Sequence, residues 1–523
     1  GDPFPLHLAP GVMLPQPPAL VQQGPFISVQ VNTTPDGMDI LGDAANEPSI
    51  AIDPTNPSNI AIGWRQFDTI ESSFREAGYS YSRDGGKTWA GALEHTPGVF
   101  GSDPVLRAGP DGELYYLSLR QVPALYCDLF VSHDFGATWQ GPIFAEGGDK
   151  AWLAVDFTDG PSRGALYQHY THDFTRSFDL GQTWSDPGGF PPTWGQIAVA
   201  PDGEVYIAGR GETHTQVARV QHAADPAQTP QIVSIGTTPI PKPLLRHHTI
   251  NPEGLVGQVN IAFDASGGPY HGRMYVLQTA NGIIEGASPQ TVLVYSDDYA
   301  GPGKATFSDP VFISDDPSLS TEWFGTLAVA PNGRLDVVWF DQRDSPPSSP
   351  FRDTRLYASY STDGGQTWAP NFPVSPIFDR RLGYPVQRKL GDYLDAHSDN
   401  LGVSLAYAAT FNGGQDIYFL RIGETDCNAD GVPDQMQTAA GLAPDCDADG
   451  IPDACQARAG EAPPCYCPAD LAFPFGSLDF DDVLAFLIAF GAGAPGADLA
   501  PPFDAVNFDD ALAFLTSFTS GCP

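Results

Sequence analysis

The stretch Ser82-Arg83-Asp84-Gly85-Gly86-Lys87-Thr88-Trp89 decides the fold, because its pattern Ser-x-Asp-x-Gly-x-Thr-Trp occurs four times in the 523 residues. The other copies are Ser132–Trp139, Ser177–Trp184 and Ser361–Trp368. Each copy follows a run in which apolar and polar residues alternate, so each predicts a turn between two β-strands. A unit that returns at intervals of about 40 to 65 residues predicts a β-propeller.

The recurring positions of the pattern have the chemistry of a tight turn. The aspartates can accept hydrogen bonds from backbone N–H groups and a neighbouring hydroxyl, and the glycines can adopt positive φ. We expect these residues to be structural: Asp84, Trp89, Asp134, Trp139, Asp179, Trp184, Asp363 and Trp368. The pattern resembles the Asp-box, or BNR repeat, of sialidase-like β-propellers. In that family the boxes lie on the blade rims, away from the catalytic face.

Seven sets of strands between residues 26 and 422 predict an all-β, seven-bladed propeller, with six blades as the alternative. The sets begin near Pro48, Val105, Trp152, Ile197, Val259, Thr326 and Gly391. The seventh set lacks a fourth strand, and Phe26–Val31 forms a strand at the other end of the propeller. Pairing it with Asp416–Leu420 closes the ring and removes two exposed edges. Catalytic sialidases are six-bladed as a family, one blade fewer than predicted here.

Composition divides the chain into an N-terminal extension (1–25), the propeller (26–422), a calcium-binding repeat linker (423–466) and a helical module (467–523). A net charge of -38 with only five lysines argues against nucleic acid or an anionic membrane as a partner, because both would be repelled. No apolar run reaches about 18 residues, so we expect no membrane span. The chain starts at Gly1 without a signal-like stretch, which indicates a mature protein, secreted or at a bacterial cell surface.

Six of the seven cysteines lie in roughly the last hundred residues, where a small domain with little core needs disulfides. They are Cys427, Cys446, Cys455, Cys465, Cys467 and Cys522. Six cysteines allow fifteen pairings, and the sequence does not choose among them. The pairing we prefer joins Cys427 to Cys446, Cys455 to Cys465, and Cys467 to Cys522. Cys127 is left over, and we expect a buried thiol there.

Two segments, 426–434 and 445–453, carry oxygen-bearing side chains at alternate positions and a glycine at the sixth. The side chains are Asp426, Asn428, Asp430, Asp434, Asp445, Asp447, Asp449 and Asp453. Ca²⁺ takes about 6–8 oxygen ligands in flexible geometry, and such spacing folds carboxylates around one point. The segments resemble thrombospondin type 3 calcium repeats, which implies Ca²⁺ as a cofactor. A pair of solvated acidic turns is the alternative.

Residues 467–523 contain an internal duplication, because Ala469-Asp470-Leu471 recurs 28 residues later as Ala497-Asp498-Leu499. Each half ends in a predicted amphipathic helix, Phe480–Leu487 or Phe508–Leu515, with acidic residues in the first turn. The pair resembles a degenerate dockerin-like module of the kind found at the C-termini of many secreted bacterial proteins. Pro474 and Pro502 stand where dockerin loops carry calcium ligands. The helices would either dock or self-assemble, or pack into a core of their own.

The resemblance to sialidases implies a site with arginines for a substrate carboxylate, a tyrosine beside a glutamate, and an aspartate as acid or base. The candidates at strand ends are Arg65, Arg343, Arg388, Tyr393, Asp341 and Glu47. The sialidase signature, a Phe/Tyr-Arg-Ile-Pro segment before the first box, is missing. The alternatives are salt bridges that brace blades for Arg65 and Arg343, and a core position for Tyr393.

Two functions follow from these observations. The first is a secreted, calcium-binding propeller that binds a glycan or a protein at the cell surface without catalysis. The second is a sialidase-like glycoside hydrolase that acts in the central funnel. The additional blade and the missing signature favour binding.

Overall fold

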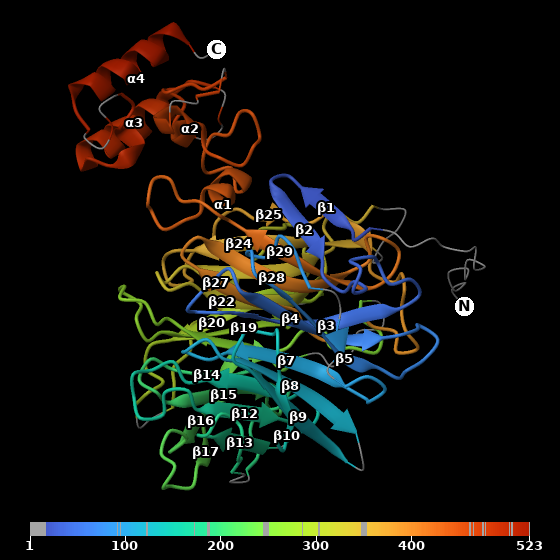
Figure 1. Cartoon of the computed structure of the whole chain (residues 1–523). Coiled ribbons are helices and arrows are strands. Elements are labelled where there is room, and N and C mark those ends of the chain that lie inside the picture. The colour runs from blue at the N-terminus through green and yellow to red at the C-terminus, as the bar shows by residue number, and fades with distance from the viewer. Residues whose placement is uncertain are drawn as a thin grey trace.

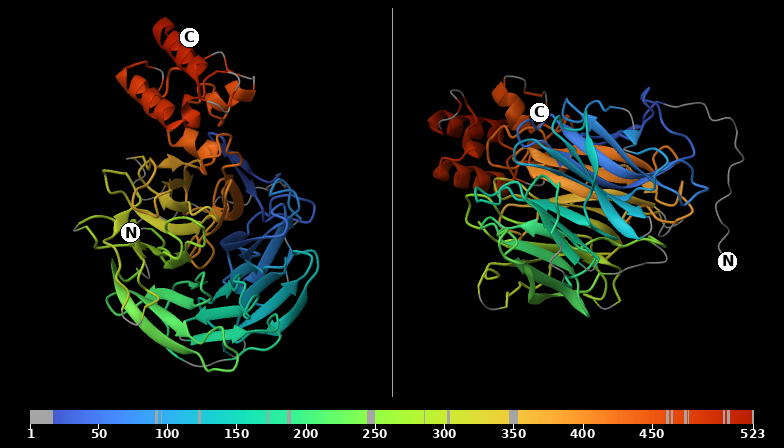
Figure 2. Two further views of the ribbon diagram at one scale, coloured as in Figure 1. Left: turned by 90° about the vertical axis from the view of Figure 1, so that its left-hand side faces the viewer. Right: turned by 60° about the horizontal axis from the view of Figure 1, so that its bottom comes forward.

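Seven antiparallel sheets surround one axis in the computed structural model and form the blades of a β-propeller (Figure 1, Figure 2). The structure describes residues 17–521 except for 91–92, 95, 122–123, 172, 186–188, 244–249, 285, 302–303, 347–352, 460–461, 464, 473–474, 476, 501–502 and 504–505. The predicted blade number of seven is confirmed. No helix within the described ranges is both long and apolar enough to cross a membrane.

The blades follow the chain in order, and the first strand of each contacts the first strand of the next around the axis. Blade 1 contains β3 (Ala44–Ile52), β4 (Ile60–Phe67), β5 (Glu76–Ser82) and β6 (Leu93–Glu94). Blade 2 contains β7 (Ser102–Ala108), β8 (Leu114–Gln121), β9 (Leu125–Ser132) and β10 (Gln140–Phe144), and blade 3 contains β11 (Trp152–Val155), β12 (Leu166–Tyr170) and β13 (Asp173–Ser177). Blade 4 contains β14 (Ile197–Val199), β15 (Val205–Arg210), β16 (His214–Gln221) and β17 (Gln231–Pro241).

Blades 5 and 6 keep the same strand order. Blade 5 contains β18 (Asn260–Phe263), β19 (Met274–Ala280), β20 (Gln290–Ser296) and β21 (Val311–Phe312). Blade 6 contains β22 (Glu322–Val329), β23 (Leu335–Asp341), β24 (Asp353–Ser361) and β25 (Phe372–Pro373), and β26 (Phe378–Asp379) also pairs with β24. Blade 7 contains β27 (Asp395–Asp399), β28 (Gly402–Ala409) and β29 (Asp416–Ile422).

An N-terminal strand completes blade 7 and closes the ring (Figure 1). β2 (Phe26–Gln30) pairs antiparallel with β29, and Ser28 lies opposite Leu420. This confirms the predicted closure. β1 (Leu20–Gln23) adds one more strand outside β2, which the sequence patterns did not predict.

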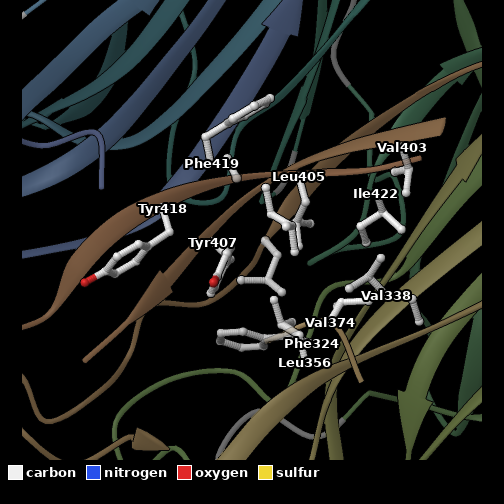
Figure 3. Close-up of a cluster of buried hydrophobic side chains, with 14 of the residues drawn as sticks. Phe324, Val338, Leu356, Val374, Val403, Leu405, Tyr407, Tyr418, Phe419 and Ile422 are labelled. Atoms are coloured by element: carbon white, nitrogen blue, oxygen red, sulfur yellow. The ribbon is translucent and has the colours of Figure 1, made fainter. Parts of the chain in front are cut away.

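Apolar side chains fill the spaces between neighbouring blades. Figure 3 shows one such cluster, to which blade 6 contributes Phe324, Val338 and Leu356, and blade 7 contributes Leu405 and Tyr407. All five side chains are buried. Burying an apolar side chain of this size contributes about 1.5–3 kcal/mol, so such seams hold adjacent blades together.

The four boxes form the same hydrogen-bonded turn. In the first copy the Ser82 hydroxyl accepts from the Gly86 N–H at 2.9 Å, and Asp84 accepts from the N–H and hydroxyl of Thr88 at 2.9 and 2.6 Å. The bonds from the threonine recur at Asp134, Asp179 and Asp363. Burial acts to raise the pKa of Asp84, but the bonds from Thr88 and its neighbours lower it to about 2. Trp89 donates from Nε1 to the Gly86 carbonyl and covers the turn.

Two loop–helix units follow the propeller and are joined by two disulfides. α1 (Asp434–Ala439) follows the first loop and α2 (Asp453–Ala459) follows the second. The disulfides are Cys427–Cys455 and Cys446–Cys465, with Cα atoms 5.9 and 6.0 Å apart. The preferred pairing of Cys427 with Cys446 and of Cys455 with Cys465 is therefore wrong.

The physical reason lies in the path of the loops. The Cys427 N–H donates to the carboxylate of Asp434, so the first loop turns back onto the start of its own helix. This leaves Cys427 facing α2, where Cys455 lies, rather than the second loop. Cys467 is also disulfide-bonded, and its predicted partner Cys522 lies outside the described residues. Cys127 is a free, buried thiol, as predicted.

The C-terminal module contains α3 (Phe480–Ala492), a 3₁₀ turn (Pro495–Ala497) and α4 (Phe508–Ser520), which confirms both predicted helices. The rings of Phe486 and Phe514 stack with centroids 4.2 Å apart at the centre of the module's own core. A second apolar face remains exposed; it is formed by Phe480, Leu484, Leu487, Ile488, Phe508, Leu512 and Leu515. Pro474 and Pro502 lie outside the described residues.

A buried carboxylate holds each loop of this module. Asp482 Oδ1 accepts from the N–H groups of Leu471 and Ala472, both at 2.8 Å, and Oδ2 accepts from the Asp479 N–H at 2.8 Å. Asp510 makes the same three bonds in the second half. These loops are thus closed by carboxylate-to-backbone bonds.

The segment after the propeller, from residue 423 onward, is called the tail. Hydrogen bonds join its first acidic loop to the propeller, and Figure 2 shows the helical module farther out, to one side of the ring. The Gly431 carbonyl accepts from Arg334 Nη1 at 3.1 Å and from Asn332 Nδ2 at 3.0 Å. Arg334 is buried, and it also binds the Asp336 carboxylate and the Asp399 carbonyl. The guanidinium therefore joins blade 6, blade 7 and the first acidic loop.

Candidate functional site

A cavity of about 260 Å³ lies at the end of the axis where the innermost strands of blades 1 to 3 begin. It is lined by Arg65, Arg75, Phe100, Asp103, Leu119, Gln121, Leu125, Asp149, Lys150, Gln387 and Lys389. Blades 1, 2 and 3 supply most of this wall, and the segment before blade 7 supplies Gln387 and Lys389. The cavity is thus eccentric: one side of the ring builds it.

Every blade has a residue with left-handed backbone at or just before its innermost strand. In blade order these are Glu47, Asp103, Lys150, Trp194, Gly257, Phe324 and Gly391. A left-handed conformation costs a non-glycine residue about 1–2 kcal/mol, and such strain gathers at functional sites. In blades 1 to 3 the residue is charged, so the repeated kink gathers Glu47, Asp103 and Lys150 near the cavity.

These kinked residues belong to a continuous network of buried ion pairs. The Lys150 ammonium pairs with Asp103 at 3.1 Å and also with Asp392. The Lys389 ammonium pairs with Asp392 at 2.7 Å and with Glu47 at 2.8 Å. All five side chains are at most one-tenth exposed. The charges alternate along the network, so each lysine is held between two carboxylates.

The network sets the protonation states around the cavity. Burial opposes the charge of Lys150, but Asp103 and Asp392 raise its pKa well above the usual value. Burial likewise opposes the charge of Asp392, but Lys150 and Lys389 hold its pKa well below the usual value. Asp149 differs, because burial raises its pKa although Lys150 acts against the shift. Of the two carboxyls that line the cavity, Asp149 rather than Asp103 therefore keeps a proton more readily; burial also raises the pKa of Glu47 beside the cavity, although Arg65 and Lys389 act against that shift.

Two guanidinium groups line the cavity. Arg65 is held by Asn46 Oδ1 at 2.8 Å and Gln387 Oε1 at 3.0 Å, and its Nη1 lies 3.4 Å from Glu47 Oε1. Arg65 Nη2 is buried and has no hydrogen-bond partner among the described residues. Burial and then the charge of Arg65 lower the pKa of Arg75. Two cations, Arg65 and Arg75, thus lie close together, and Arg65 keeps N–H donors that bind no acceptor among the described residues.

Packed side chains from three blades close the axis near this network. The Tyr393 hydroxyl donates to the Pro104 carbonyl at 2.9 Å, and its ring meets Trp152 of blade 3 edge-on at 5.4 Å. Arg107 of blade 2 pairs with Asp395 of blade 7 at 2.9 Å. These contacts join blades that are not neighbours in the ring, so side chains span the axis itself.

The structure brings together three of the six predicted site residues. Arg65 lines the cavity, Glu47 pairs with it, and Tyr393 is buried, with Glu47 among the charges that act on its phenol. Asp341 and Arg343 instead pair with each other at 2.9 Å; both lie in blade 6, so this salt bridge does not join two blades. Arg388 is half exposed and lies 3.5 Å from Glu253.

Sequence reasoning missed four charged members of the site: Asp103, Lys150, Lys389 and Asp392. One signal could have found the cations, because the chain has only five lysines and two of them are buried here. A lysine in an otherwise lysine-poor chain is costly to bury unless it is paired. The acidic partners have no comparable signal, since the chain has 63 acidic residues.

The second acidic loop of the tail gathers carboxylates at one point. Asp445 accepts from the N–H groups of Asp449 and Gly450 at 3.2 and 2.9 Å. Carboxylate oxygens of Asp445, Asp447 and Asp453 lie within 4.8 Å of one another. Burial, followed by the neighbouring carboxylates, raises the pKa of Asp453. Hard oxygen donors crowded in this way fit a divalent cation such as Ca²⁺.

The first acidic loop repeats these bonds. Asp426 accepts from the N–H groups of Asp430 and Gly431 at 3.2 and 2.9 Å. Gln437 donates to Asp430 at 2.8 Å, as Gln456 does to Asp449 in the second loop. The eight predicted ligands occupy equivalent places in the two loops: Asp426, Asn428, Asp430 and Asp434, then Asp445, Asp447, Asp449 and Asp453.

Comparison with known proteins connects the chain to one repeat family. Residues 359–370 match the family model described as BNR/Asp-box repeat. No curated protein matches the sequence. Among solved structures, a protein of unknown function from Dyadobacter fermentans is 13% identical, with 77% of this chain and 99% of that chain covered and a TM-score of 0.40.

Two further solved structures are named for enzymes. An α-L-arabinanase from Penicillium chrysogenum, complexed with arabinobiose, is 12% identical, with 78% of this chain and 99% of that chain covered and a TM-score of 0.39. The Trypanosoma rangeli sialidase in complex with the inhibitor DANA is 12% identical, with 75% of this chain and 59% of that chain covered and a TM-score of 0.37. With seven blades closed by an N-terminal strand, and the matched repeat in blade 6, the chain is a seven-bladed β-propeller that carries BNR/Asp-box repeats.

Proposed function

We propose that the protein works outside the cell and binds an acidic glycan in its axial cavity without cleaving it. The observation that carries this proposal is the pair Arg65 and Arg75, two adjacent guanidinium groups of which one keeps a buried, unpartnered Nη2. A carboxylate matches the donor geometry of a guanidinium and relieves the repulsion between the two cations. The disulfides of the tail support an oxidising environment.

The groups that catalysis would need are occupied. The Tyr393 hydroxyl donates to a backbone carbonyl, and Glu47 is paired with Lys389 and Arg65. A tyrosine nucleophile needs a free hydroxyl and a base able to take its proton. These contacts favour binding over glycosidic cleavage.

A sialidase-like glycoside hydrolase is the second candidate, and one observation favours it. Asp149 lines the cavity, and burial raises its pKa, as a general acid requires. If this candidate is correct, the protein releases phenol from at least one member of a panel of aryl glycosides that includes a sialoside, and Asp149→Asn abolishes the release. If the wild-type protein releases phenol from none of these glycosides, the hydrolase candidate is wrong.

The binding proposal is tested by calorimetric titration with acidic monosaccharides and with their neutral counterparts. Arg65→Met should weaken binding of the acidic sugars at least tenfold, because one hydrogen bond to a charged group contributes about 1.5–3 kcal/mol. Arg388→Met is the matched control, since Arg388 is half exposed and paired with Glu253. Equal affinity for acidic and neutral sugars, or unchanged binding by Arg65→Met, contradicts the proposal.

We also propose that the two acidic loops bind Ca²⁺ and that the ions stiffen the tail. The support is the repeated geometry and the crowding of Asp445, Asp447 and Asp453. Metal binding couples to folding, so chelation should expose residues 423–467 to protease while the propeller stays resistant. Equal protection of the tail with and without chelator contradicts this part of the proposal.

The helical module is proposed to attach the protein to a partner at the cell surface. Its outer face exposes large apolar side chains, such as Phe480 at 73% and Phe508 at 77%. Residues 467–523 contain no lysine, arginine or histidine, so a second copy would be repelled and a protein with a basic rim around an apolar groove is favoured. Leu487→Glu combined with Leu515→Glu should release the protein from a cell-envelope fraction, and retention of this variant contradicts the idea.

A further inference from the structure

Three carboxyl groups are buried where the N-terminal segment closes the ring. Asp39 lies between β2 and blade 1, Asp43 lies just before β3, and Asp416 begins β29. Their exposed fractions are 7, 2 and 1%. None of them forms an ion pair with a lysine, arginine or histidine of the described chain. Three acids therefore share one buried region without a compensating cation.

Amide side chains are the main hydrogen-bond partners of these acids. Gln30 donates to Asp39 at 2.6 Å, and Gln66 donates to Asp43 at 2.8 Å. Asn32 Nδ2 donates to Asp416 Oδ1 at 2.8 Å. Asp416 Oδ2 is buried and has no hydrogen-bond partner among the residues that the structure describes. Among the described residues, the titratable group that faces the three acids is Tyr418, on whose phenol the charges of Asp416 and Asp39 act; Tyr407 packs against Tyr418 with ring centroids 5.7 Å apart.

The same network lies on the backbone ladder that joins the two ends of the propeller. The Val31 N–H donates to the Ile417 carbonyl, and the Ile417 N–H donates to Asn32 Oδ1, both at 2.8 Å. The Ala45 N–H donates to the Gln415 carbonyl at 2.7 Å. Charge that builds up on the acids therefore acts directly on the bonds that close the ring.

We propose that this cluster is a proton-dependent clasp: the N-terminal segment stays paired with β29 while the acids hold protons, and it is loosened when they ionise. Burial and then the charge of Asp416 raise the pKa of Asp43 to about 8. Burial also raises the pKa of Asp416 to about 7, and the charge of Asp39 adds to the effect. Burial raises the pKa of Asp39 in the same direction.

The sign of the pH effect follows from linkage. In the opened segment the carboxyls are in water with ordinary pKa values of about 3.9, so they are ionised at neutral pH. The closed state therefore holds more protons than the open state between about pH 4 and pH 8. Closure is fully stabilised at acidic pH and is lost as pH rises through the folded-state pKa values, with opening favoured up to tenfold per pH unit for each proton released.

The test is hydrogen exchange of the Val31 and Ile417 amides in the full-length protein at pH 6 and pH 8, corrected for the intrinsic exchange rates. We expect the opening constant to rise at least tenfold between these pH values. Asp416→Asn, whose side chain cannot ionise, should reduce that rise. Asp36→Asn is the matched control, because Asp36 lies exposed in the same N-terminal segment and should leave the rise unchanged.

Three results would overturn the clasp. The first is equal corrected protection of the wild-type amides at both pH values. The second is an undiminished rise in Asp416→Asn or, if that variant does not fold, in Asp43→Asn. The third is a change in protection on adding chelator or Ca²⁺ at constant pH, because a cation would then compensate the acids in place of protons.

Discussion

Asp482→Asn replaces one oxygen of the carboxylate that closes the first loop of the helical module. The side chain is fully buried, and its two oxygens accept three backbone N–H groups, all at 2.8 Å. The amide can keep its carbonyl toward Leu471 and Ala472, but its NH₂ group then faces the Asp479 N–H. One charge-assisted bond is lost and two donors are brought together.

The magnitude follows from that lost bond. A hydrogen bond to a charged group contributes about 1.5–3 kcal/mol, and a buried donor without a partner costs a similar amount. We take about 2 kcal/mol, which raises the opening constant of the module roughly 30-fold. Two short helices have little other stability with which to absorb such a loss.

Hydrogen exchange of the α3 amides in the full-length protein measures this opening constant. Asp481→Asn is the control, because Asp481 is exposed in the same turn and should change exchange by only a few-fold. The duplication supplies a second trial, since Asp510→Asn should have the same effect on α4. Protection of α3 that is equal in Asp482→Asn and Asp481→Asn would refute the argument that the carboxylate holds the loop.

Three further outcomes are expected from the propeller and the tail. Gly78→Ala should lower the free energy of unfolding, measured in urea, by about 1–3 kcal/mol, because the added Cβ would lie 2.6 Å from Trp64 Nε1. Gly491→Ala is the control and should not lower it, because no atom lies within 4 Å of the Cβ added there. Arg343→Met should cost about 3 kcal/mol in the same assay by leaving the Asp341 carboxylate buried without its partner, yet leave sugar binding unchanged. Peptide mapping without reduction should recover Cys427 linked to Cys455, and recovery of the Cys427–Cys446 peptide would contradict the structure.

The architecture was predictable because its signals are local and repeated. The boxes combine turn residues with a covering tryptophan in eight positions, and the strand left over at Phe26–Val31 matched the strand missing from blade 7. Pattern and pairing rules are sufficient for such features. The extra strand β1 was not predicted, because its four residues have no comparable sequence pattern.

The cavity was predictable only in part, because its contacts join distant parts of the chain. Arg65 and Glu47 could be found at predicted strand ends, but the pair Lys150–Asp392 spans 242 residues. The left-handed kinks that gather the charges occur at Glu47, Asp103 and Lys150, and of these residue types only aspartate is enriched at positive φ. The disulfide pairing failed for a similar reason, since the path of each loop decides which cysteine is near.

The junction at Gly431 decides how a force on the tail reaches the ring. Tension applied at the C-terminus arrives at Gly431 before it reaches β29, and Arg334 diverts part of it to Asp336 at the start of the second strand of blade 6. β29 is the strand that pairs with β2 and keeps the ring closed. Sharing the load between two blades therefore shields that strand from being peeled away when the C-terminus is pulled.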